Sequence, residues 1–298
     1  MSMDLGVVIR PELDPEGLVE HVRRAEAAGL QEVWLWEDCF WAGGIAATAT
    51  ALAATERVGV GIGIVPAPVR NAAFAAMEAA TLARLHPGRF HMGMGHGVGK
   101  WMRQVGAKPA SQLALLEEAV VAVRALLAGE TVSVEGRYVR LRDVKLEHPP
   151  RVVPPVSVGV RGPKGLELAG RVADGTVIDS LSSPAYVRWA RERIEAGRAA
   201  AGRHDPHRLT VYAFCATDAA GEAAIREQLD AQRAEGGVRA GFLAADTPLS
   251  DLAVTGDADL RARTLKALKD AGADCVVLVA PDARTPLDLG ALALPTAR

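Results

Sequence analysis

The sequence is poor in aromatic residues and in cysteine, and both shortages narrow the classes of protein that it can encode. Aromatic residues make up 4% of the 298 positions, and the only cysteines are Cys39, Cys215 and Cys275. An odd number of widely separated thiols does not form a disulfide framework or a zinc-binding motif. We therefore expect reduced thiols in a cytoplasmic protein.

Long hydrophobic runs and an excess of one charge are also missing. No stretch approaches 18 uninterrupted apolar residues, so no transmembrane helix is expected. The opening MSMDLGVVIR carries an acid and a short strand-like run, which is unlike a signal peptide. The net charge is −2 and no dense Lys/Arg stripe occurs, so neither nucleic acid nor an anionic membrane surface is expected as a partner.

Several common catalytic and cofactor motifs are absent as well. The glycine-rich run 93–99 has Val98 where a dinucleotide-binding motif needs glycine, and Met94 and Trp101 break the phosphate-loop pattern. No H-E-x-x-H spacing and no G-x-S-x-G elbow occur, so neither a metal site nor a hydrolase triad is predicted. The glycines after this strand still allow backbone N–H groups to approach an anion, although a turn required only for packing explains them too.

The chain does contain a repeated strand–helix alternation. Short runs rich in β-branched residues alternate with helical patterns, and small residues with glycine end several helices just before the next strand. The eight predicted strands are 5–9, 32–36, 58–64, 89–94, 156–160, 175–179, 210–214 and 275–279. This pattern favours a single (β/α)8 TIM barrel spanning residues 1–298. A doubly wound sheet is the alternative, but it would normally carry a glycine fingerprint after the first strand.

Two segments interrupt the alternation. Residues 129–155 contain two short alternating runs on either side of Glu135 and Gly136, which predicts a hairpin or extended insertion. Residues 236–256 give no clear pattern. We expect both segments, with loop 99–110, to shape a ligand pocket.

The loops that follow the strands carry the candidate functional residues. In a parallel barrel the catalytic groups come from the carboxyl ends of the strands. Glu37 and Asp38 follow the second strand, although two solvated loop acids would look the same. The RGPKG sequence at 161–165 opens a helix, where free N–H groups favour a phosphate. His91 lies within a strand, facing either the core or the barrel interior, whereas His96 lies in the glycine-rich loop and is the better ligand contact.

At this level of detail the sequence resembles the luciferase-like monooxygenase superfamily. The resemblance rests on the joint order of GLQEVWLWEDCF, RVGVGIGIVPAPVRN, AAMEAATLARLHPGRFHMGMGHG and GVRGPKGLELAGRVADGTVIDSLSS. It is strongest to the branch that uses the deazaflavin coenzyme F420, with an FMN-using branch close by. It implies a barrel with an insertion and a flavin-type ring held at the carboxyl-end face.

The resemblance also implies roles for individual positions. Asp38 corresponds to an acid beside the ring, and Gly63-Ile64 corresponds to a non-prolyl cis peptide that backs the ring, which the sequence alone does not establish. The remaining implied contacts are with the coenzyme's ribityl-phosphate arm and its phosphate. They are His96, Gly97 and Val98 for the arm, the helix start at Arg161, Gly162, Pro163 and Lys164 for the phosphate, and Ser180 as a nearby polar group.

One departure from the resemblance concerns the proton donor. Deazaflavin relatives commonly carry Asp-His where this chain has Asp38-Cys39, and a thiol with an unperturbed pKa of about 8.5 is a poor replacement. Asp38, Glu37, His91 and water are the candidates.

The resemblance thus implies a flavin- or deazaflavin-dependent oxidoreductase that transfers a hydride between coenzyme F420 and a small organic substrate. The alternatives are an FMN-dependent monooxygenase that uses oxygen and a non-catalytic flavin-binding protein. The substrate is not predicted. A homodimer that uses helices 45–54, 72–84 and 111–127 is compatible with their small residues, but core packing explains those residues equally well.

Overall fold

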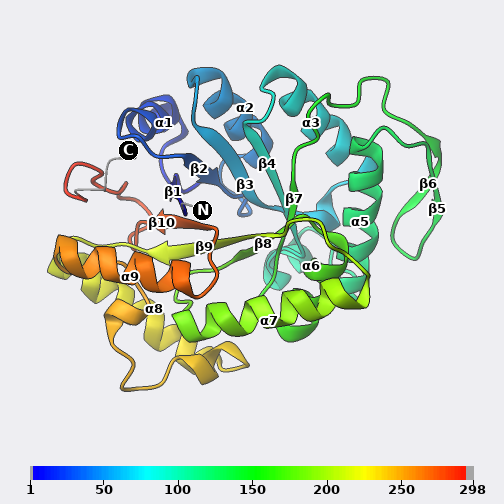
Figure 1. The fold of residues 1–298 in the computed structure, drawn as a ribbon. Coiled ribbons are helices and arrows are strands. Elements are labelled where there is room, and N and C mark those ends of the chain that lie inside the picture. The colour runs from blue at the N-terminus through cyan, green and yellow to red at the C-terminus, as the bar shows by residue number, and fades with distance from the viewer. Residues whose placement is uncertain (1–2, 293–298) are drawn as a thin grey trace.

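Eight parallel strands close into a barrel in the computed structural model, which describes residues 3–292 (Figure 1). The strand order around the barrel is β1-β10-β9-β8-β7-β4-β3-β2. The strands are β1 (Asp4–Val8), β2 (Glu32–Leu35), β3 (Gly59–Pro66), β4 (Phe90–Gly95), β7 (Val156–Gly159), β8 (Gly175–Ile178), β9 (Arg208–Phe214) and β10 (Cys275–Val279). Closure confirms the predicted barrel and rules out the doubly wound sheet. Residues 1–2 and 293–298 of the predicted domain lie outside the described residues.

Helices surround the barrel on its outer face (Figure 1). They are α1 (Leu18–Ala27), α2 (Gly44–Ala54), α3 (Ala72–Leu85), α5 (Gln112–Leu127), α6 (Pro163–Val172), α7 (Pro184–Ala200), α8 (Ala219–Glu235) and α9 (Ala258–Asp270). Helix α7 begins with a side-chain cap, because the Ser183 hydroxyl accepts a hydrogen bond from the Tyr186 N–H and Pro184 follows as the first helical residue. None of the helices in residues 3–292 combines the length and apolarity needed to cross a bilayer.

The two irregular segments take definite forms. The predicted hairpin is present as the antiparallel pair β5 (Val132–Glu135) and β6 (Arg140–Val144), and the Glu118 carboxylate of α5 accepts hydrogen bonds from three successive N–H groups in its turn. Residues 236–256 form two short 3-10 turns and a parallel bridge between Cys215 and Val254. One element differs from prediction: part of the loop after β4 forms the short helix α4 (Gly99–Gln104).

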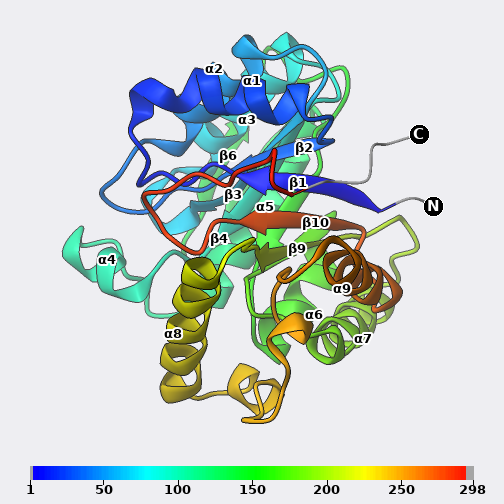
Figure 2. The ribbon, with the colours of Figure 1, turned by 90° about the vertical axis from the view of Figure 1, so that its left-hand side faces the viewer.

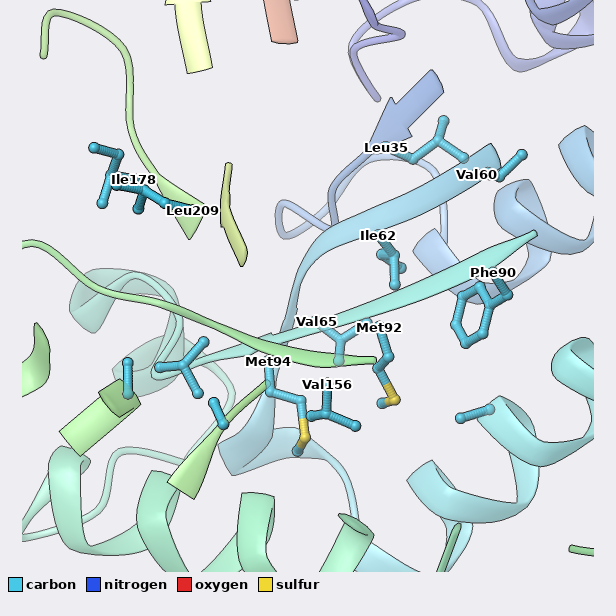
Figure 3. Close-up of a cluster of buried hydrophobic side chains, with 14 of the residues drawn as sticks. Leu35, Val60, Ile62, Val65, Phe90, Met92, Met94, Val156, Ile178 and Leu209 are labelled. Carbon is cyan, nitrogen blue, oxygen red and sulfur yellow. The ribbon is translucent and has the colours of Figure 1, made fainter. Parts of the chain in front are cut away.

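Alternate residues of the strands face two separate apolar regions. Side chains such as Ile62, Phe90 and Met92 lie between the strands and the helical layer (Figure 3). Trp34, Tyr212 and their neighbours instead fill the barrel interior. This two-sided burial explains why the strands read as nearly continuous apolar runs.

Candidate active site

A cavity of about 630 Å³ lies at the carboxyl ends of the barrel strands. Its lining comes from residues at or near the carboxyl ends of β2, β3, β4, β7, β8 and β9, together with Gly99 and Trp101 of α4 and Glu235 of α8. In Figure 2, β1 and β10 point to the left, and α4 and α8 project from that same side. The volume suits a small-molecule or cofactor site.

Two glycines and a β-bulge leave one wall of the cavity without protruding side chains. The register of β3 against β4 shifts between Ile62 and Val65, and the Gly63–Ile64 peptide within this bulge is cis, as the family resemblance implies. A Cβ on Gly95 would lie 2.7 Å from Ile64 Cγ1, and one on Gly159 would lie 2.6 Å from Ile64 Cγ2. Only glycine therefore fits beside Ile64, and the resulting surface suits a planar ligand.

Tyr212 supports this bulge from the barrel interior. Its hydroxyl donates a 3.0 Å hydrogen bond to the Gly63 carbonyl oxygen, and its ring packs against Trp34 and Trp36. Tyr212 also lines the cavity, so one side chain connects the packed interior to the ligand site.

Asp38 is a half-buried carboxyl in the cavity wall, in the loop that follows β2. Burial is the main cause that raises its pKa to about 6. The negative charges of Glu12 and Asp179 act in the same direction, whereas Trp36 and Arg10 act against it. Near neutral pH this group exchanges a proton readily, which is the property of a general acid or base.

Glu37 also lines the cavity, but other groups hold it in place. Both carboxylate oxygens pair with the Arg70 guanidinium, and Oε2 accepts a 2.8 Å hydrogen bond from the Gly44 N–H. A carboxylate engaged in this way anchors its loop to the start of α2 and to the segment between β3 and α3. The geometry therefore favours Asp38 over Glu37 for proton transfer.

His91 lies outside the cavity, which separates it from the other catalytic candidates. It is the second residue of β4, and its Nε2 is 3.5 Å from Glu32 Oε1 at the amino end of the barrel, where Arg208 also pairs with Glu32. Burial lowers the pKa of His91. A proton donor must reach its substrate, so this position removes the geometric basis for His91 as the donor.

The two glycine-containing loops meet on one side of the cavity because β4 and β7 are neighbours. Gly97 adopts a φ of 67°, which glycine tolerates, and His96 Nδ1 lies 2.8 Å from the Gly97 carbonyl oxygen. A carbonyl oxygen only accepts, so Nδ1 is the donor in this contact. His96, Gly97 and Val98 line the cavity together with Arg161 and Gly162.

The other predicted phosphate contacts lie just behind this lining. Pro163 and Lys164 are the first two residues of α6, next to Gly162. Ser180 is buried, and its N–H donates to Asp179 Oδ1 over 2.9 Å. Neither Lys164 nor Ser180 lines the cavity as described, so their contact with a phosphate stays a prediction.

Asp179, Tyr212 and Glu235 line the cavity but were not among the sequence candidates. Asp179 follows β8, so the signal that identified Glu37 and Asp38, an acid at a strand's carboxyl end, would have found it. It pairs with Arg161 at 3.6 Å and with Arg239 at 3.3 Å. Tyr212 and Glu235 reach the site only through tertiary packing, and the local sequence gives no signal for them.

A closed parallel barrel with a cavity at the carboxyl ends of its strands is the arrangement of a TIM-barrel enzyme. A flat glycine wall, a neighbouring acid and anion-friendly loops are the features that a flavin-type ligand requires.

The family pattern of luciferase-like monooxygenases matches residues 3–281, and the chain belongs to this family. Two relatives are similar to it in sequence over more than half of its length. The chain is 32% identical over 213 residues to a 5,10-methylenetetrahydromethanopterin reductase of Methanolobus tindarius, covering 71% of this chain and 64% of that protein. It is 32% identical over 191 residues to an F420-dependent hydroxymycolic acid dehydrogenase of Mycobacterium tuberculosis, covering 59% of this chain and 52% of that protein.

A solved structure extends the likeness to almost the whole fold. An F420-dependent secondary alcohol dehydrogenase, bound to an F420–acetone adduct, superposes with a TM-score of 0.84 over 98% of this chain and 97% of its own. Its sequence identity is 22%, so this likeness concerns the fold alone.

Proposed function

We propose that this chain is an F420-dependent oxidoreductase that transfers a hydride between the coenzyme's deazaflavin ring and a small organic substrate. The observation that carries the proposal is the pairing of a flat, glycine-lined wall with Asp38, whose pKa is raised to about 6. The first positions a planar ring, and the second supplies the proton that accompanies hydride transfer. The similarity to a dehydrogenase that carries F420 dependence in its name supports the choice of coenzyme.

The residues present fit the coenzyme. When bound, the deazaflavin supplies the hydride chemistry. Gly95, Gly159 and the Gly63–Ile64 peptide would face the ring. The loop at His96–Val98 would contact the polar arm. The amino end of α6, with Arg161 and Lys164, would hold the phosphate, because its N–H groups and cationic side chains favour an anion.

The protein's own contribution is position and proton transfer. Asp38 would donate a proton to the substrate during reduction and accept one during oxidation. Burial and the carboxyls of Glu37 and Asp38 raise the pKa of the Cys39 thiol, so Cys39 stays protonated near neutral pH and does not act as a base. We therefore assign proton transfer to Asp38, because Arg70 holds the Glu37 carboxylate and His91 lies outside the cavity.

The proposal is tested by titrating the purified protein with coenzyme F420 and with FMN, each oxidised and reduced, followed by fluorescence. Tight binding of the deazaflavin, and hydride exchange with secondary alcohols or imines, would support it. If the protein instead prefers reduced FMN and consumes oxygen, the result would favour an FMN-dependent monooxygenase. Binding of F420 without turnover of any alcohol, imine or alkene would favour a non-catalytic protein.

A matched pair of lysine variants tests the phosphate site. Lys164→Gln removes a charge at the start of α6, and Lys145→Gln removes one just after β6, away from the cavity lining. We expect Lys164→Gln to weaken F420 binding roughly 3–10-fold, and Lys145→Gln to leave it unchanged. Equal affinities in the two variants would contradict the phosphate assignment.

A further inference from the structure

The segment around α4 carries a cluster of positive charge at the edge of the cavity. Lys100, Arg103 and Lys108 are exposed, and we call these three residues the α4 patch. No Asp or Glu occurs between Glu78 and Glu117, so the chain around the patch supplies no neutralising charge of its own. Within residues 3–292, no member of the patch forms an ion pair.

Two of these cations converge on a residue of the cavity wall. A Cβ on Gly99 would lie 3.9 Å from Arg103 Nη1 and 3.9 Å from Lys108 Nζ. Gly99 and Trp101 both line the cavity, so the patch adjoins the ligand site. Like charges brought together without a counter-ion repel one another, and an anion placed between them relieves that repulsion.

The cavity wall has the opposite charge. Four carboxyl residues line it (Glu37, Asp38, Asp179 and Glu235), against the single arginine Arg161. Arg70 pairs with Glu37 and Arg239 pairs with Asp179, so Arg161, 3.6 Å from Asp179, is the cation of the cavity lining that is left for the phosphate. This arrangement disfavours a ligand group with several negative charges inside the cavity and favours it at the α4 patch.

We infer that the α4 patch binds the chain of carboxylates in the tail of the deazaflavin coenzyme, beyond the phosphate held at α6. This inference rests on the proposed function. The ring and the tail then occupy regions of different character, a nearly flat, glycine-lined wall for the ring and a basic rim for the tail. The patch contributes affinity and leaves the chemistry at Asp38 untouched.

The test compares two forms of the coenzyme on the same protein. One carries its tail of several carboxylates, and the other is truncated after the phosphate. Dissociation constants are measured by fluorescence at low and at high ionic strength. We expect the tailed form to bind roughly ten-fold more tightly at low ionic strength, and the preference to shrink at high ionic strength because salt screens exposed charges.

The variant Lys100→Gln/Arg103→Gln/Lys108→Gln should lose this preference while keeping the wild-type affinity for the truncated form. The matched control is Arg140→Gln/Arg142→Gln/Lys145→Gln, which removes three exposed charges in and next to β6 and should keep the preference. Thermal melting of both variants checks that each remains folded.

The possible outcomes separate the inference from the proposed function. A tail preference that persists in the α4 variant, or no preference in the wild type, overturns the α4 inference and leaves F420 binding intact. Failure of the wild type to bind either form overturns the proposed function and the inference with it.

Discussion

Among single residues, Asp38 is the best candidate for proton transfer, because burial and neighbouring charges raise its pKa to about 6. In the direction that reduces the substrate, the protonated carboxyl is the active form, so we expect kcat/KM to fall as pH rises above about 6. Asp38→Asn should lower the rate roughly 10²–10⁴-fold and remove this pH dependence. The measurement is a pH–rate profile at saturating coenzyme.

Glu12→Gln gives an independent check on the same carboxyl. Glu12 raises the pKa of Asp38 while Arg10 lowers it, so losing the Glu12 charge should lower that pKa and move the descending limb to lower pH. Glu147→Gln, at an exposed position outside the cavity lining, is the control and should leave the limb in place. An unchanged profile in Glu12→Gln would argue against Asp38 as the titrating group.

Gly63 and Tyr212 pack closely against each other, and variants of each residue test how much this contact contributes to stability. A Cβ on Gly63 would lie 2.3 Å from the Tyr212 hydroxyl and 2.9 Å from the Trp34 ring. We expect Gly63→Ala to destabilise the fold by about 1–3 kcal/mol. Tyr212→Phe should cost about 1 kcal/mol through the lost hydrogen bond to the Gly63 carbonyl.

Urea unfolding of the double variant measures how far the two residues depend on each other. Because Tyr212→Phe removes the closest clashing atom, Gly63→Ala should cost less in that background than in the wild type. Additive losses would mean that the clash with Trp34 alone accounts for the effect.

Between elements, the closest packing is between α6 and α7, and it lies next to the predicted phosphate site. A Cβ on Gly197 would lie 2.0 Å from the Glu167 carbonyl oxygen, and one on Gly170 would lie 2.1 Å from the Ile194 carbonyl oxygen. Helix backbones this close leave no room for a methyl group. Gly197→Ala should therefore destabilise the protein by about 1–3 kcal/mol by forcing the helices apart.

The same variant should also weaken coenzyme binding, although Gly197 does not line the cavity. Movement of α6 displaces Gly162 and the amino end of the helix, where we place the phosphate. Gly241→Ala is the control, because a Cβ there meets no atom within 4 Å. Loss of stability in Gly197→Ala without loss of F420 affinity would show that α6 does not position the ligand.

The elements also show where sequence patterns suffice and where they fail. The predicted strand 275–279 has the same bounds as β10, because a short apolar run rich in valine that follows a helix-ending glycine is typical of a buried strand. Helix α4 was missed because six residues that begin with glycine have no helical periodicity to detect. Such a short helix forms because Met102 is buried beneath it, which is a tertiary contact.

For the whole molecule, the sequence predicts the barrel, but it does not predict how far along the barrel axis each side chain lies. Residues that follow strands were correctly brought together, since parallel strands end on one face; Asp38, His96 and Arg161 all line one cavity. His91 fell at the opposite end because it lies near the start of its strand, a fact that depends on where the strand begins. Tyr212 reaches the site across the barrel interior, which no local pattern encodes.

Whole-molecule stability should depend on pH through two groups that act in opposite directions. Burial is the main cause that lowers the pKa of His207 to about 4, helped by three nearby arginines. Between about pH 6.5 and 4 the unfolded chain binds a proton that the folded chain refuses, so this group costs stability as pH falls, up to about 3 kcal/mol. Asp38 has a raised pKa of about 6, so the folded chain binds its proton first and gains stability as pH falls through the same window.

Single variants separate the two contributions. His207→Gln lowers stability at every pH through lost packing and the lost contact with Thr176, but its free energy of unfolding should decline less between pH 6.5 and 4 than that of the wild type. Asp38→Asn should decline more steeply, and it should be more stable than the wild type at pH 7.5 because a buried carboxylate is removed. Urea unfolding across this range measures both slopes. Parallel curves for the three proteins would mean that neither group titrates in the folded state as its burial requires.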